Sequence, residues 1–257
     1  MKTNRLFYWP LMLVVFVSGL VFTGCSEENE EPASITPSSV SLYVGDKAYL
    51  TYIGGKCTWT SETPFIASVT NEGKVTGNKV GSTIIKANEL SCKVTVKGRY
   101  NTYKEPCVKW GSSIDYVDFF MDGYLLEKNY SDRDGLIYIG SGKVKHYIYL
   151  FDNDKLQSST VMISTDYSEE VAGFLSERYA IISYDIDNYS FTFVDHKKEK
   201  CIFVKIYNLS YLQITYTDYP KSRGDVITKS NINIIENEGS QLDKSIIFKQ
   251  FSESLEQ

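Results

Sequence analysis

The residue types that usually catalyse reactions or bind metals are scarce in this sequence. His146 and His196 are its two histidines, and neither belongs to a His-x-x-x-His or His-Glu pair. No two cysteines have the spacing of a zinc site, and the sequence contains no Gly-x-Ser-x-Gly elbow and no phosphate-binding glycine loop. We therefore expect no catalytic residue, no bound metal and no cofactor.

Pairs of acidic residues are the one pattern that favours an enzyme. Asp132, Asp134, Asp185 and Asp187 could supply the two carboxylates of a glycoside hydrolase. Residues 152–154, Asp-Asn-Asp, are similar to the start of a calcium loop but lack its glycine and its distal glutamate. Because acidic side chains bond the local backbone in turns, a turn role is the simpler interpretation of each.

Cys25 carries the clearest chemical signal. It follows a basic start, an apolar core at residues 11–22 and the small residues Thr23-Gly24. This order is typical of a secretory signal. The Gly-Cys at its end resembles the bacterial lipobox, although a phenylalanine stands where leucine is commonest. The resemblance implies a signal peptide at residues 1–24 and lipid attachment at Cys25. The alternative is an uncleaved membrane helix.

Residues 25–33 are expected to form an acidic tether between the lipid and the folded chain. The serine after Cys25 suits outer-membrane sorting, and the acidic run is similar to the signal that sends some Gram-negative lipoproteins to the cell surface. A solvated tether is the alternative interpretation, because like charges repel and keep a chain extended. We expect the outer membrane as one partner through the lipid anchor. The net charge of −5 argues against nucleic acid as another.

Residues 34–98 consist of short alternating apolar segments separated by turn residues, which predicts an all-β sandwich. Its motifs are, in order, Ile35-Thr36-Pro37, Leu42-Tyr43-Val44-Gly45, Trp59-Thr60-Ser61, Ile66-Ala67-Ser68-Val69, Gly73-Lys74-Val75-Thr76 and Gly81-Ser82-Thr83-Ile84-Ile85. These motifs resemble the bacterial immunoglobulin-like domain, group 2. The resemblance implies a spacer without a catalytic site, with Trp59 in the centre of the sandwich and Gly73 and Gly81 in backbone conformations that favour glycine.

The four cysteines after Cys25 allow three pairings. Cys57 and Cys92 lie in predicted strands that could face each other across the sandwich, so we predict a disulfide between them. Two small buried hydrophobic side chains are the alternative. Cys107 and Cys201 could form a second disulfide or remain separate thiols, because the sequence gives no geometry with which to decide.

Residues 102–219 predict an α+β domain. Helices are expected near residues 112–123 and 168–179, from capping residues and apolar positions at helical spacing. Four strand-like runs follow each, which suggests two helix-plus-four-strand halves joined in one antiparallel sheet with both helices on one face. The start of the segment resembles an uncharacterised domain of other surface lipoproteins, which implies no activity. Residues 220–257 are expected to be a partly disordered tail, with a weak helical pattern at residues 240–255.

Tyrosines are concentrated in this second domain. Tyr147 and Tyr149 alternate along one predicted strand, and Tyr211 and Tyr216 lie in the last one. If the face opposite the helices exposes these rings, they could stack on a glycan or bind a protein; filling of the core is the alternative. We hypothesise a non-enzymatic, lipid-anchored surface protein that binds or adheres while raised on an immunoglobulin-like spacer. An inhibitor or assembly partner that faces the periplasm is the alternative, and an enzyme is third.

Overall fold

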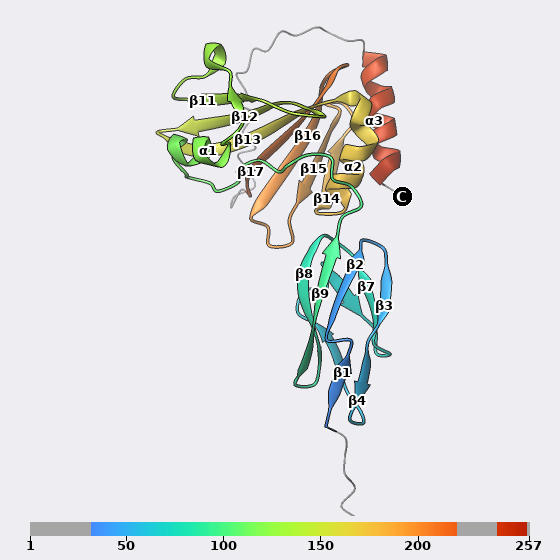
Figure 1. The fold of residues 1–257 in the computed structure, drawn as a ribbon. Coiled ribbons are helices and arrows are strands. Elements are labelled where there is room, and N and C mark those ends of the chain that lie inside the picture. The colour runs from blue at the N-terminus through green and yellow to red at the C-terminus, as the bar shows by residue number, and fades with distance from the viewer. Residues whose placement is uncertain (1–31, 220–240, 256–257) are drawn as a thin grey trace, which may run out of the picture.

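The computed structural model describes residues 32–219 and 241–255 (Figure 1). A small body of short strands precedes a larger body built on one wide sheet, and residues 98–102 connect the two. The predicted signal peptide, the lipid site at Cys25 and residues 220–240 of the predicted tail lie outside the described residues. Within the described part of the chain, no helix has the length and apolar character needed to cross a membrane.

The first body is a β-sandwich. One sheet has the order β2-β9-β8-β5, in which β2 and β9 are parallel, and it lies against a second sheet with the order β3-β7-β6. A pair of strands, β1 and β4, forms the end that lies farthest from the larger body (Figure 1). The strands are β1 Ser34–Thr36, β2 Ser39–Tyr43, β3 Lys47–Tyr49, β4 Thr51–Ile53, β5 Trp59–Ser61, β6 Ala67–Val69, β7 Lys74–Gly77, β8 Gly81–Ala87 and β9 Leu90–Lys97.

Alternation along these strands builds the core of the sandwich. Val75, Ile85 and Val94 are fully buried, as expected when every second side chain points inward. Trp59 packs against this core but remains partly exposed. Gly73 has a φ of +78°, and a Cβ atom there would lie 2.3 Å from the Leu50 carbonyl oxygen. Both the backbone conformation and the close approach therefore require glycine.

The second body is built on an eight-stranded antiparallel sheet. Its order is β10-β11-β12-β13-β17-β16-β15-β14, so the strands that follow helix α1 form one side and those that follow helix α2 form the other. Strands β13 and β17 join the two sides through a register that pairs Val161 with Ile214. The strands are β10 Leu125–Leu126, β11 Gly135–Ile139, β12 Val144–Asp152, β13 Lys155–Ser164, β14 Ala180–Asp185, β15 Ser190–Val194, β16 Lys200–Asn208 and β17 Tyr211–Asp218.

Helices and an extended segment cover one face of this sheet (Figure 1). The helical elements are α1 Ile114–Phe120, η1 Lys128–Tyr130, η2 Thr165–Tyr167, α2 Ser168–Ser176 and α3 Gln241–Leu255. Helix α1 begins after Ser113, whose hydroxyl accepts a hydrogen bond from the Tyr116 N–H at 3.3 Å. Residues 99–112, which we call the strap, run over the sheet from α2 to α1.

Helix α3 lies where the predicted tail has its weak helical pattern. Residues 241–255 form a helix that packs beside α2 and over β14 to β16. Phe251 is fully buried, and the ring of Phe248 stacks on that of Phe191 with centroids 4.5 Å apart. The weak helical pattern of this segment was visible, but its apolar side is narrow and becomes stable only through packing against the sheet.

Candidate functional site

The tyrosines predicted to form an exposed binding surface are mostly in the core. Tyr147, Tyr149 and Tyr216 are 2%, 0% and 0% exposed, so the prediction of an exposed surface is wrong for these three. They lie on the face that the helices and the strap cover, together with Val161 and Ile214. Alternation along a strand separates two faces but does not reveal which face the helices cover.

The buried tyrosines hold the strap against the sheet. The Tyr147 hydroxyl donates to the Lys104 carbonyl at 3.0 Å, and the Cys107 N–H donates to the Tyr149 hydroxyl at 3.4 Å. The hydroxyls of Tyr103 and Tyr216 form a hydrogen bond of 2.7 Å. Burial raises the pKa of the phenol groups of Tyr103, Tyr149 and Tyr216 well above the ordinary value. These residues therefore fasten the chain within the domain and offer no contact surface.

Tyr211 lies apart from the other three. It is opposite Ser164 at the end of β17 and alternates with the buried Leu212, which places it on the face away from the helices. Its side chain is half-buried. The four tyrosines therefore do not form one surface.

The cysteines contradict the predicted disulfide. Cys57, Cys92, Cys107 and Cys201 are all free thiols. Cys57 precedes β5, and Cys92 lies in β9 of the same sheet, with β8 between these two strands. Two strand spacings amount to about 10 Å, beyond the reach of a disulfide. Burial raises the pKa of the Cys201 thiol to about 11.

The two histidines have separate surroundings. The Nε2 atom of His146 lies 3.2 Å from a carboxylate oxygen of Glu127, and burial lowers the pKa of the imidazole while Glu127 opposes this effect. The ring of His196 stacks on Phe65 of the sandwich, with centroids 5.5 Å apart. Among residues 32–219 and 241–255, no group of three or more His, Cys, Asp or Glu side chains could hold a metal ion.

The acidic pairs occupy turns, at opposite sides of the sheet. One carboxylate oxygen of Asp132 accepts from the N–H groups of Asp134 and Gly135, both at 2.9 Å. A carboxylate oxygen of Asp185 accepts from the N–H groups of Asp187 and Asn188, at 3.0 and 3.1 Å. Asp132 precedes β11, whereas Asp185 ends β14, so the two pairs do not share a site. The structure thus gives the carboxylates a role in shaping turns.

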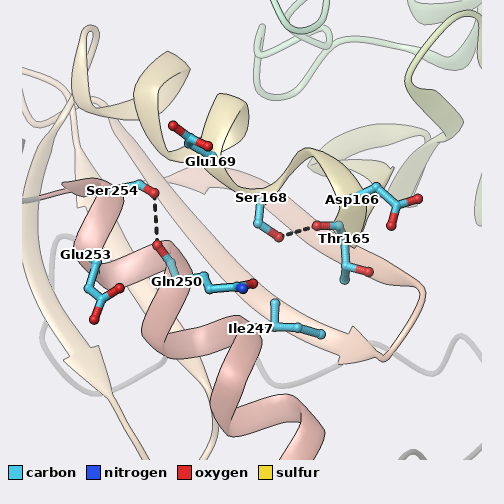
Figure 2. Close-up of a pocket in the computed structure, with 8 residues that line it drawn as sticks. All are labelled: Thr165, Asp166, Ser168, Glu169, Ile247, Gln250, Glu253 and Ser254. Carbon is cyan, nitrogen blue, oxygen red and sulfur yellow. Dashed lines mark hydrogen bonds between the residues drawn. The ribbon is translucent and has the colours of Figure 1, made fainter.

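A groove lies between the start of α2 and helix α3 (Figure 2). It has a volume of about 590 Å³ and is lined by Thr165, Asp166, Ser168, Glu169, Ile247, Gln250, Glu253 and Ser254. The Ser168 and Ser254 hydroxyls donate to the carbonyls of Thr165 and Gln250, so they bond within their own segments (Figure 2). Three carboxylates give the groove a negative charge. Its lining contains no cysteine or histidine that could act as a nucleophile or base.

The outer edge formed by β14 exposes several apolar side chains. Ile181, Ile182 and Tyr184 in the strand and Ile186 just beyond it are 45%, 53%, 67% and 61% exposed. Strand β14 is the last in the sheet order, so one side of its backbone pairs with β15 and the other has no neighbouring strand among the described residues. The apolar run Ala180-Ile181-Ile182 indicated a strand, but a sequence does not show which strand ends up at an edge.

The likeness of this chain to known proteins is clearest in the β-sandwich. No curated protein matches the chain. A solved structure of the surface layer protein SbsC, domains 4–9, is 18% identical with a TM-score of 0.20. That match covers 75% of this chain and 27% of that chain, so this chain spans little more than a quarter of that structure. The model of the bacterial Ig-like domain (group 2) matches residues 31–94, which contain the sandwich from β1 into β9. The segment 31–94 is therefore a bacterial Ig-like domain of group 2.

Proposed function

We propose that this chain is a non-enzymatic, lipid-anchored protein of the bacterial cell surface whose second body binds an extended segment of a partner protein. The Ig-like domain serves as the spacer between the anchor and the binding body. The family match supports an envelope role. The order of basic start, apolar core and Gly24-Cys25 supports the anchor.

The exposed edge strand β14 is the observation on which the binding proposal rests. An edge strand presents a row of backbone N–H and C=O groups that match another extended chain. Natural proteins usually protect such edges with very short strands, charges or covering segments. At the opposite edge of the same sheet, β10 is only two residues long, whereas β14 has six residues and carries Ile182 and Tyr184 exposed to solvent.

The chemistry of this edge favours a peptide over a glycan. Sugars bind on flat aromatic platforms, and aromatic residues of the inner strands, such as Tyr149 in β12 and Phe193 in β15, are buried. A peptide strand would instead pair with the β14 backbone and pack apolar side chains against Ile181 and Tyr184. Asp185 and Asp187 at the end of the strand favour a basic residue at the corresponding position of the partner.

A protein that faces the periplasm is the second candidate, as an inhibitor or assembly partner. The same edge strand would serve it, because strand addition does not depend on the side of the membrane. The version that acts through a tyrosine-rich surface loses its support, since Tyr147, Tyr149 and Tyr216 are buried.

Site-specific photo-crosslinking in living cells tests the binding proposal. A photoreactive amino acid would replace Tyr184, which is 67% exposed, and in a matched control Tyr49 of the Ig-like domain, which is 65% exposed. We expect a discrete protein adduct at position 184 that is absent at position 49 and disappears when Ile182→Lys places a charge on the exposed strand. No adduct at position 184, or equal adducts at both positions, would contradict the proposal.

The location is tested with proteinase added to intact cells that carry a tag at Gln257. Loss of the tag from intact cells supports the cell surface, whereas protection until the outer membrane is broken supports the periplasmic candidate. Metabolic labelling with a fatty acid is expected to label the protein and to leave the Cys25→Ala variant unlabelled. Absence of label on the native protein, or equal label on the variant, would overturn the lipid anchor.

A further inference from the structure

The two bodies meet at the C-terminal end of α2. The last carbonyl groups of a helix have no partner within the helix and carry the negative end of its dipole. Here the Ig-like domain supplies the missing donors. The Val80 N–H donates to the Glu177 carbonyl at 2.7 Å, and the Lys79 ammonium group donates to the Ser176 carbonyl. One domain thus caps a helix of the other.

The Glu177 side chain forms a second set of bonds, to the chain that leaves the Ig-like domain. One carboxylate oxygen accepts from the Arg99 N–H at 2.8 Å, and the other accepts from the Tyr100 N–H at 3.1 Å. Glu177 is only 5% exposed, and the Arg178 guanidinium group lies 3.6 Å from its carboxylate. A buried carboxylate is stable only when it is bonded and paired, so losing this arrangement is costly.

The connecting segment is shaped to fit this carboxylate. A Cβ atom at Gly98 would lie 2.8 Å from Oε2 of Glu177, closer than side chains tolerate. The Arg178 guanidinium group also donates to the Tyr100 carbonyl at 3.3 Å. The adjacent residues Glu177 and Arg178 therefore both bind the connecting segment. Arg99 in turn bonds back to the sandwich through the Val44 carbonyl at 3.2 Å. The segment is therefore bonded to both bodies along its length.

We propose that Glu177 fixes the two bodies in a single relative orientation, so that the Ig-like domain is a rigid support and does not move independently on a flexible linker. We call the residues that do this the joint: Lys79, Val80, Gly98, Arg99, Tyr100, Glu177 and Arg178. Strand β14 begins at Ala180, directly after the joint. The joint thus sets the direction in which this edge points relative to the Ig-like domain. This inference does not depend on what the edge binds.

Limited proteolysis of the full chain with trypsin tests the joint, because Arg99 is a cleavage site within it. In the native protein the Arg99 and Tyr100 amides are bonded, so cleavage requires local opening. We expect Glu177→Ala to speed cleavage after Arg99 by about tenfold or more, since two charge-assisted hydrogen bonds are lost. Glu169→Ala is the matched control, because it removes an exposed carboxylate from the same helix and is expected to leave the rate unchanged.

A second variant changes the connecting segment and leaves Glu177 in place. Gly98→Ala places a methyl group against the Glu177 carboxylate without altering α2, and we expect it to speed cleavage in the same way. Hydrogen exchange of the core strands β8 and β17 must remain slow in both variants, which separates opening of the joint from global unfolding. Unchanged cleavage in both folded variants would overturn the proposal, and so would faster exchange in these strands together with the cleavage.

Discussion

The hydrophobic core of the Ig-like domain contains no tyrosine, whereas the core of the second body contains the tyrosines Tyr103, Tyr138, Tyr147, Tyr149, Tyr179 and Tyr216. Each of these phenols has a hydrogen-bond partner, such as Asp118 for Tyr138 and Glu105 for Tyr179. In the described part of the chain, no buried side-chain nitrogen or oxygen is without a partner. The first core therefore has no phenol to titrate, whereas the stability of the second depends on the protonation of its phenols as well as on packing.

Alkaline pH should produce the largest difference in stability between the two bodies. Burial raises the pKa of all six phenols above the ordinary value of 10.0. The unfolded chain therefore releases protons that the folded body retains, and stability falls as pH rises above about 10. At about pH 11 each phenol that stays protonated in the folded body costs about 1 kcal/mol, so the group costs several kcal/mol, a large part of the stability of a domain.

Hydrogen exchange with mass spectrometry across this pH range would measure the effect in each body separately. We expect the strands β12 to β17 to lose protection first, while β7 to β9 remain protected. The comparison fails if the Ig-like domain unfolds at a lower pH than the second body.

Matched leucine truncations should have the next largest effect. Leu50 and Leu156 are 3% and 1% exposed, one in each core. Replacing either with alanine leaves a cavity, and we expect each variant to lower the stability of its own body by about 2–5 kcal/mol. Urea unfolding followed by hydrogen exchange would assign the loss to a body. A cost below about 1 kcal/mol for Leu156→Ala would mean that the phenol network, and not close packing, dominates the second core.

Removing one hydroxyl should lower the stability of the second body, because its hydrogen-bond partner is left without a bond. Tyr216→Phe deprives the fully buried Tyr103 of its 2.7 Å hydrogen bond, and we expect a loss of about 1–3 kcal/mol in chemical denaturation. The double variant Tyr103→Phe with Tyr216→Phe should cost less than the two single variants added together, because neither hydroxyl is then orphaned. Additive losses would show that the bond itself contributes nothing.

Thiol reactivity gives the smallest and most local contrast. Cys57 in the Ig-like domain is partly exposed, whereas Cys92, Cys107 and Cys201 are buried. At about pH 8 we expect iodoacetamide to label Cys57 in the folded protein and to reach the other three only after unfolding, since the thiolate is the reactive form. The pKa of about 11 for Cys201 makes it the slowest. Labelling of Cys201 at the rate of Cys57 would contradict the described burial.

The sequence allowed the Ig-like domain to be predicted because its signals are local. The turn glycines, the alternation of Val94 with Val96 and the order of motifs all act within a few residues, and the family match confirms the assignment. Helices α1 and α2 were also found at the expected positions, since Ser113 and the acidic residues 169–170 mark their first turns. The pattern of helix α3 is weaker in the sequence, because its stability comes from distant partners such as Phe191.

The candidate sites were harder to predict because they depend on which elements become neighbours. The order of strands in the sandwich separates Cys57 from Cys92, and alternation does not reveal this order. The tyrosines of β12 and β17 were correctly placed in strands, but the face that the strap covers is set by tertiary contacts. The exposure of Ile182 likewise follows from the position of β14 at an edge, which no local pattern encodes.

The packing of α3 affects the order in which the two bodies can fold. The Ig-like domain has all its strands once residue 97 has emerged. The second body cannot enclose Phe191 until Phe248 and Phe251 arrive from the far end of the chain. A chain that emerges from its N-terminus therefore carries a finished support and an open sheet, and only its final helix converts that sheet into a closed domain.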